Sequence, residues 1–279
     1  MRLNLLLILL IVFTSACNSD IGLQPGKETL QPPAQPGITA TITLTSTLTP
    51  ISPTPTPELI NEVCSPLADE GLAELPEIIT QAFKMPRPGN DDGHQGVDFA
   101  YYRRKDRNGI EGLDVKAALS GIVVTILNDR WPYGHAVIIE TPIEKINPVI
   151  LKNLTRSQIE PTIVPDPRVN CPPGELIFGM DQSSRSLYIL YGHLKDLAIL
   201  SIGDTVECGQ SIGTVGNSGY STNPHLHFET RIGPSGARFD SMAYYTAASS
   251  QAERYNYCVW RVSNLFQLFD PMELLSIQE

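Results

Sequence analysis

Short apolar runs separated by turn residues are the feature of this sequence that most restricts its fold. From Met85 onward these runs are rich in Val, Ile and Tyr and are bounded by Gly, Asn and Asp, which is typical of β-strands and tight turns. No long helical pattern alternates with them, so we expect a mainly β, antiparallel fold rather than a parallel α/β sheet. The expected strands are Gly96–Phe99, Val115–Ala118, Gly121–Leu127, His135–Glu140, Ser186–His193, Gln210–Val215 and His225–Arg231.

Three further segments differ from this pattern. Residues 58–83 have apolar residues at helical spacing, interrupted by Pro66 and Pro76, and we expect short helical pieces there. Thr141–Arg185 contains too many prolines for regular structure, and Asp240–Arg261 mixes small residues with tyrosines. We expect both to be long loop insertions, the second either holding substrate or packing on the sheet.

The N-terminal residues indicate export. Arg2 precedes an unbroken apolar run, which is followed by Thr14-Ser15-Ala16-Cys17. A basic residue, a short apolar core and small residues form a secretory signal, and the run is too short to span a membrane. Small residues leading into Cys17 resemble a bacterial lipobox, so we expect residues 1–17 to be a signal peptide that leaves Cys17 as a lipid anchor. An ordinary signal peptide with an incidental cysteine is the alternative.

Composition sets further limits on the rest of the chain. Residues 18–57 are mainly Thr, Pro, Ser, Gln and Gly, which predicts a disordered stalk ahead of a folded domain over residues 58–279. The formal net charge of -10 argues against nucleic acid as a partner, because such partners require an excess of Lys and Arg. The oligomeric state is left open.

Cysteine spacing favours disulfides over a structural zinc site. Apart from Cys17 the chain has Cys64, Cys171, Cys208 and Cys258, and no two of them are close in sequence. In an exported protein two disulfides are plausible, with three possible pairings. Because Cys64 and Cys258 lie near the two ends of the expected domain, we favour Cys64–Cys258 and therefore Cys171–Cys208.

Four of the five histidines lie in short contexts that suggest chemistry. His225 and His227 are two residues apart in an expected strand and would share one face, and His94 and Asp98 would likewise face one point. Two imidazoles and a carboxylate are suitable zinc ligands. We expect the fifth histidine, His135, to be structural.

The combination of these motifs resembles the LytM/lysostaphin-type zinc endopeptidases of peptidase family M23. Further similarity lies in residues 114–124, 203–213 and 217–222 and at Phe269-Asp270-Pro271, so that the resemblance spans roughly Met85 to Leu275. The three main motifs are His94-Gln95-Gly96-Val97-Asp98, Tyr191-Gly192-His193-Leu194 and Pro224-His225-Leu226-His227-Phe228-Glu229.

The resemblance implies an antiparallel β-sheet groove with one zinc ion at its floor. It assigns His94, Asp98 and His227 as zinc ligands and His193 and His225 as the catalytic pair, without saying which of the two is the general base. The implied function is hydrolysis of peptide cross-links in bacterial peptidoglycan by an exported, membrane-anchored enzyme. The alternative is a non-catalytic wall-binding protein or amidase activator that keeps the fold.

Overall fold

The computed structural model describes residues 59–152, 154, 171 and 181–276. The predicted signal peptide with Cys17, the predicted stalk and most of the Pro-rich segment between residues 155 and 180 lie outside the described residues. Among the residues described, no helix is both long and apolar enough to cross a membrane.

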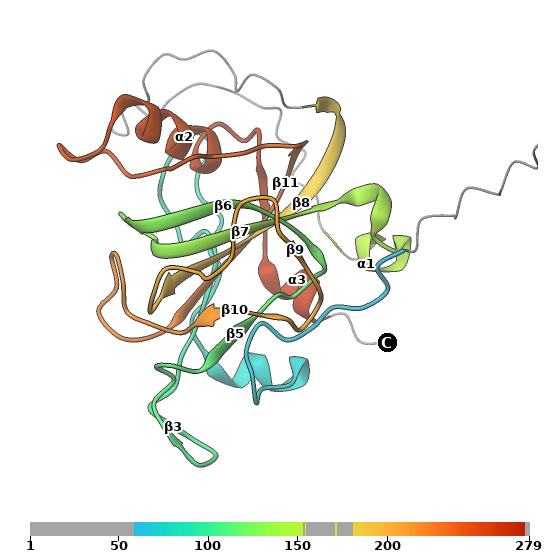
Figure 1. Cartoon of the computed structure of the whole chain (residues 1–279), viewed down its shortest axis with the longest axis vertical. Coiled ribbons are helices and arrows are strands. Elements are labelled where there is room, and N and C mark those ends of the chain that lie inside the picture. Colours follow the sequence, from blue (N-terminus) through green and yellow to red (C-terminus); the bar gives the residue numbers. More distant parts are fainter. Residues whose placement is uncertain (1–58, 153, 155–170, 172–180, 277–279) are drawn as a thin grey trace, which may run out of the picture. The chain divides into compact units, whose positions relative to one another are not determined.

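One antiparallel sheet dominates the described part of the chain (Figure 1). It has eight strands: seven follow the spatial order β1-β2-β11-β8-β7-β6-β9, and the eighth, β12, pairs with β11. Their bounds are β1 (Ile79–Gln81), β2 (Val97–Phe99), β6 (Gly121–Arg130), β7 (Gly134–Pro142), β8 (Asp181–Leu194), β9 (Thr205–Val206), β11 (Leu226–Ser235) and β12 (Gln267–Phe269). The prediction of a mainly antiparallel β fold is confirmed.

Both faces of this sheet are covered, which explains why its central strands are almost continuously apolar. Along β8, Leu187, Ile189 and Tyr191 pack into one apolar cluster, while Tyr188 and Leu190 pack into a second. This alternation follows from the two-residue period of a strand. The two clusters are therefore the cores on the opposite faces of the sheet.

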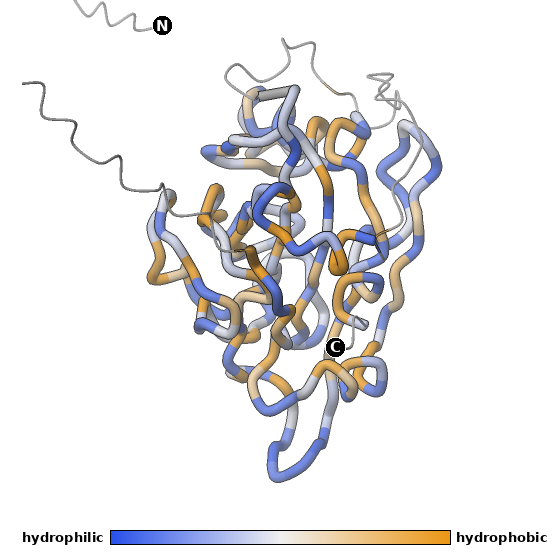
Figure 2. The backbone as a smooth tube through the Cα atoms, turned by 90° about the vertical axis from the view of Figure 1, so that its right-hand side faces the viewer, coloured by the Kyte–Doolittle hydropathy of each residue, from blue (hydrophilic) through white to orange (hydrophobic). Residues whose placement is uncertain are grey.

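The smaller elements cover these two faces. The first core is shared with η1 (Leu72–Ile78), α3 (Pro271–Leu275) and the ladder of β5 (Asp114–Lys116) with β10 (Ser211–Thr214). The second core is covered by α2 (Gln251–Arg261) and the chain on either side of it. The hairpin of β3 (Arg103–Arg104) and β4 (Arg107–Asn108) is hydrophilic and projects from the rest (Figures 1 and 2).

The two expected loop insertions contain more regular structure than predicted. Within Thr141–Arg185, β7 continues to Pro142, η2 (Ile143–Lys145) and α1 (Pro148–Lys152) follow, and β8 begins at Asp181. Pro148 is tolerated because it occupies the first position of α1, where its missing N–H has no helical partner. The end of Asp240–Arg261 is the helix α2 rather than loop.

The start of α2 carries a sequence signal that predicts it. Ser250 accepts a hydrogen bond from the backbone N–H of Glu253, and the Glu253 side chain accepts one from the backbone N–H of Ser250. This reciprocal pair is a capping box, and the spacing Ser-x-x-Glu identifies it in a sequence. We expected a loop here because the segment is rich in tyrosines and small residues, and this signal for a helix was missed.

The favoured disulfide pairing is wrong. The structure pairs Cys64 with Cys208 and Cys171 with Cys258. Cys64 donates its backbone N–H to Ala118, and the backbone N–H of Cys208 bonds to the Ser120 hydroxyl, so the chain around residues 118–120 brings the first pair together. The position of a cysteine near one end of the domain was no guide to its partner.

Candidate metal centre

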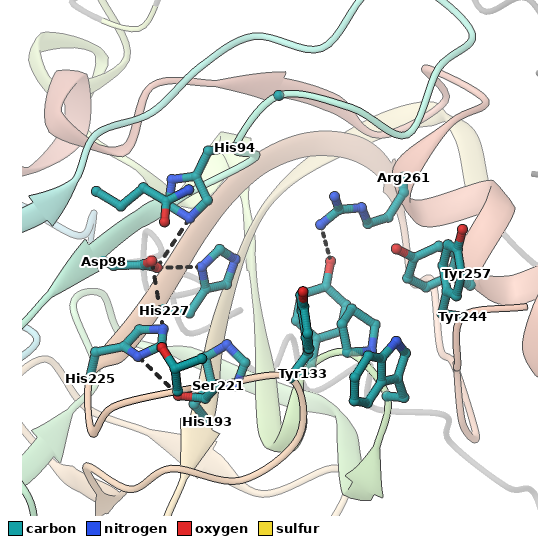
Figure 3. Close-up of a pocket in the computed structure, with 16 residues that line it drawn as sticks. His94, Asp98, Tyr133, His193, Ser221, His225, His227, Tyr244, Tyr257 and Arg261 are labelled. Carbon is teal, nitrogen blue, oxygen red and sulfur yellow. Dashed lines mark hydrogen bonds and ion pairs between the residues drawn. The ribbon is translucent and has the colours of Figure 1, made fainter. Parts of the chain in front are cut away.

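The strand register brings His94, Asp98 and His227 to one point. In the pairing of β2 with β11, Asp98 lies directly opposite His227. The Asp98 Oδ1 atom is 2.7 Å from His227 Nδ1 and 3.2 Å from His94 Nε2. Asp98 and His227 are buried and His94 is partly exposed, so the cluster lies at the floor of an accessible site (Figure 3).

Gly96 makes this close approach of β2 to β11 possible. A Cβ atom at this position would be 2.6 Å from the Phe228 carbonyl oxygen and 2.9 Å from His227 Cε1. Any larger residue would therefore displace the backbone or the His227 ring. The first motif therefore requires Gly at position 96, because a side chain there would collide with the ring of His227, a proposed ligand on β11.

Backbone and carboxylate acceptors fix the orientation of the ligand imidazoles. His94 Nδ1 lies 3.0 Å from the Ala82 carbonyl oxygen, which can only accept, so Nδ1 carries the hydrogen of the neutral imidazole and Nε2 keeps a lone pair on the side of Asp98. His227 Nε2 lies 3.0 Å from the buried Glu229 carboxylate, which leaves Nδ1 to face Asp98. Such acceptors behind a ligating imidazole set its tautomer.

The charges at the cluster favour a cation. Burial alone would raise the pKa of Asp98, but hydrogen bonds and the charges of His227 and His94 lower it far below its usual range. Burial disfavours a charged His227, yet hydrogen bonds to Asp98 and Glu229 raise its pKa to about 9. The cluster therefore holds an anionic carboxylate beside an imidazole with a strong affinity for a cation, whether a proton or a metal ion.

His193 and His225 lie next to the cluster as a pair. Their ring centroids are 4.6 Å apart, and the His193 ring is 5.7 Å from that of His227. His193 Nδ1 donates to the Ser218 carbonyl (2.8 Å) and His225 Nδ1 donates to the Asn223 carbonyl (2.8 Å), so both Nε2 atoms are available as bases. His225 Nε2 is 3.6 Å from Asp98 Oδ2.

His193 has an unusual backbone and a shifted pKa. Its φ of 59° lies in the left-handed region, which residues other than Gly seldom adopt, and backbone hydrogen bonds to Tyr133 and Gly216 hold it there. Burial, together with the charges of His227 and His225, lowers the pKa of His193 to about 3. The imidazole is therefore neutral and able to accept a proton over the whole physiological range.

An open groove passes over these side chains. A cavity of about 560 Å³ is lined by all five residues of the predicted site, with Trp131, Tyr220, Tyr244 and Tyr257 along its wall. A second cavity of about 420 Å³ adjoins it, since Gln81, Asp98, Thr222 and His225 line both, and it continues toward Tyr101, Asn108 and Glu111. The cluster thus lies between two stretches of the groove.

The structure brings together every residue that the sequence singled out for the site, and it keeps His135 apart. His135 Nδ1 accepts a hydrogen bond from the Asp129 backbone N–H (3.2 Å), and His135 does not line the groove. Four residues behind the cluster were missed, namely Asp91, Tyr133, Glu229 and Arg261. Glu229 is the last residue of the motif Pro224-His225-Leu226-His227-Phe228-Glu229, whereas no spacing pattern in the sequence indicates Arg261.

The donor set fits a zinc ion. His94, Asp98 and His227 each offer one ligand atom, and these atoms lie within 4.8 Å of one another. Two imidazoles and a carboxylate with an open side are the protein ligands that a catalytic zinc site uses. An antiparallel sheet that carries this set in a groove, next to the imidazoles of His193 and His225, has the arrangement of a metal-dependent hydrolase.

Comparison with known proteins agrees with this class. Residues 174–240, which include His193, His225 and His227, match the model of peptidase family M23. A metalloprotease of Buchnera aphidicola is 48% identical over 48 residues, covering 17% of this chain and 12% of that protein. The glycyl-glycine endopeptidase ALE-1 of Staphylococcus capitis is 51% identical over 39 residues, covering 14% of this chain and 10% of that protein.

A solved structure gives a more distant likeness. The catalytic domain of lysostaphin from Staphylococcus simulans aligns with 59% of this chain and 87% of that domain at 22% identity, with a TM-score of 0.33. The likeness to the family therefore rests on the sequence matches, and the chain spans only about a tenth of the length of each curated relative. Over residues 174–240 the chain resembles the M23 peptidases, and its shorter matches include a lysostaphin-type endopeptidase, as its motifs predicted.

Proposed function

We propose that this chain is a zinc metalloendopeptidase that hydrolyses peptide cross-links of bacterial peptidoglycan. The observation that carries the proposal is the convergence of His94, Asp98 and His227 at the floor of an open groove, beside the free Nε2 atoms of His193 and His225. These are the metal ligands and the acid–base pair that hydrolysis of an amide requires.

His94, Asp98 and His227 would hold the zinc ion in this proposal. When bound, zinc lowers the pKa of water to about 7 and polarises a carbonyl group. His193 and His225 do the remaining work. One takes the proton of the attacking water and passes it to the leaving amine, and the other, when protonated at Nε2, donates a hydrogen bond to the developing oxyanion.

The pKa of His193 bears on this division of roles. A base whose pKa is about 3 is neutral in the resting site but binds a proton weakly. His193 is therefore suited to accept the proton transiently and release it at once. Both imidazoles are held by carbonyl acceptors behind them, so neither has to reorient between these steps.

The groove supports an internal bond as the substrate. It continues on both sides of Asp98 and His225, so a peptide can extend beyond the reacting bond in either direction. The aromatic wall on one side includes Trp131 and Tyr220, whose ring centroids lie 4.6 Å apart and whose side chains are exposed. These features support endopeptidase rather than exopeptidase action.

The nature of the peptide is proposed from the relatives. A protein named for its glycyl-glycine endopeptidase activity shares about half of its residues with this chain over the aligned segment. We extend this to cross-linking peptides of the wall, with the enzyme exported and anchored through Cys17. The long segment of residues 18–57 would allow the domain to reach the wall from a membrane.

The test is incubation of the full chain with purified, cross-linked cell walls of several bacterial types. We expect newly released peptides that mass spectrometry assigns to one type of peptide bond, and we expect no release by His225→Ala. Wall binding without release of any peptide by the zinc-loaded protein would contradict the proposal and would favour a wall-binding protein or amidase activator.

A further inference from the structure

We infer that Arg261, the last residue of α2, is a positioning residue of the metal centre. The inference rests on the proposed function and extends it to a helix that supplies no ligand. Arg261 lines the groove beside Tyr133 and Tyr257, and it bonds to both of the chain segments that carry the proposed ligands (Figure 3). It contacts an acidic residue on each of them.

The first contact is on β11, two residues beyond His227. Arg261 Nη1 donates to Glu229 Oε1 at 3.1 Å, the same oxygen that accepts from His227 Nε2 at 3.0 Å and from the Tyr133 hydroxyl at 2.8 Å. Glu229 is completely buried. Arg261 and Tyr133 therefore hold this oxygen against Nε2 of the His227 imidazole, so that Nδ1 on the other side of the ring faces the cluster.

The second contact is on the segment that carries His94. Arg261 Nε donates to Asp91 Oδ1 at 2.7 Å, and the Tyr257 hydroxyl, one helical turn earlier in α2, donates to Asp91 Oδ2 at 2.7 Å. Asp91 is three residues before His94. One guanidinium thus connects the loop with His94 to the strand with His227.

Arg261 contributes orientation more than charge balance. Glu229 Oε2 is paired separately, by Arg231 Nη2 at 3.0 Å and by Trp260 Nε1 at 3.1 Å. A variant without the Arg261 guanidinium therefore keeps a charge partner for Glu229, but its Oε1 and the Asp91 loop lose their common donor. Residues that orient a ligating imidazole typically change metal affinity by about 10- to 100-fold when they are replaced.

The position of α2 is itself well determined, as this role requires. Its N-terminus is closed by the capping box of Ser250 and Glu253, and Cys258, within its last turn, is joined to Cys171. The Arg261 side chain is 12% exposed and its guanidinium lies 5.7 Å from the Tyr257 ring centroid. A helix fixed at both ends can hold a guanidinium to the precision that ligand positioning needs.

The experiment measures zinc affinity and the visible spectrum of the cobalt-substituted full chain for Arg261→Met, Arg261→Lys and Arg254→Met. Arg254 is a matched control, because it is on the same helix and stacks on Tyr245, 4.6 Å from the ring centroid, outside the groove lining. We expect Arg261→Met to weaken zinc binding about 10- to 100-fold and to shift the cobalt bands. Arg261→Lys should recover part of the affinity, and Arg254→Met should bind zinc as the wild type does.

Unchanged zinc affinity and cobalt bands in folded Arg261→Met would overturn the inference, as would an equal loss in Arg254→Met. If Arg261→Met does not fold, Arg261→Lys gives the test, since it keeps the positive charge but lacks the guanidinium fork that donates to Asp91 and Glu229 together. Unchanged zinc binding in that variant would also overturn the inference. A wild-type chain that binds no zinc would overturn the proposed function together with it.

Discussion

At the scale of single residues, Gly96 shows how little space the centre has. We predict that Gly96→Ala lowers the free energy of unfolding by about 1–3 kcal/mol, because the new methyl group meets the Phe228 carbonyl and the His227 ring. Zinc binding should weaken as well, since the ring that moves carries a proposed ligand. Denaturant unfolding and competition with a chelator measure the two effects.

Gly71→Ala is the control for this prediction. Gly71 has an ordinary negative φ of -76°, and a Cβ there would be no closer than 3.6 Å to any neighbour. Alanine at that position should change stability by less than about 1 kcal/mol and leave zinc binding unchanged. Equal effects of the two substitutions would show that the close approach at Gly96 has no importance for the centre.

At the scale of elements, α2 gives a pH-dependent prediction through Glu253. This carboxylate accepts hydrogen bonds from Ser250, Ser241 and Arg130. Burial alone would raise its pKa, but these bonds outweigh burial and lower the pKa from its ordinary 4.5 to about 2. The stabilisation is therefore complete above pH 4.5 and is lost as the pH falls toward 2.

We predict that Glu253→Gln destabilises the protein by about 1–3 kcal/mol at pH 7, and that the difference from the wild type disappears near pH 2. Urea unfolding at a series of pH values measures it. Glu144→Gln, at an exposed position in η2, should have little effect at any pH. A Glu253→Gln difference that stays constant from pH 7 to pH 2 would contradict the account of this cap.

At the scale of the whole molecule, the sequence predicted the parts of the site that are local in the chain. His94 and Asp98 are four residues apart, and His225 and His227 are two apart, so strand geometry alone groups each pair. The two groups come together only through the pairing of β2 with β11, in which Asp98 meets His227 about 130 positions later in the chain. No rule based on local sequence predicts that pairing. The family resemblance provided that step.

The support behind the ligands was not predictable in this way. Arg261 reaches Asp91 across 170 positions of the chain and Glu229 across 32, and an arginine at the end of a helix has no distinctive spacing. The same holds for Cys64 and Cys208, which meet because both bond to the chain around residues 118–120. Such contacts are set by how elements pack, whereas motifs record only local geometry.

The proposed anchor gives a prediction for the chain in its cell. If Cys17 is lipidated, wild-type protein should sediment with membranes and require detergent for release, and Cys17→Ser should be found in the soluble exported fraction. Fractionation followed by immunoblotting measures this. Membrane association that is the same for Cys17→Ser and the wild type would rule out the anchor and leave the enzyme proposal intact.

The zinc content of purified full chains, measured beside peptide hydrolysis, tests the central claim most directly. We predict about one zinc per chain in the wild type and in His225→Ala, almost none in His94→Ala, and hydrolysis by the wild type alone. His225→Ala separates the two roles, because it removes a proposed acid–base group and leaves all three proposed ligands in place. Hydrolysis by a zinc-free wild-type chain, or full zinc content in His94→Ala, would contradict the account.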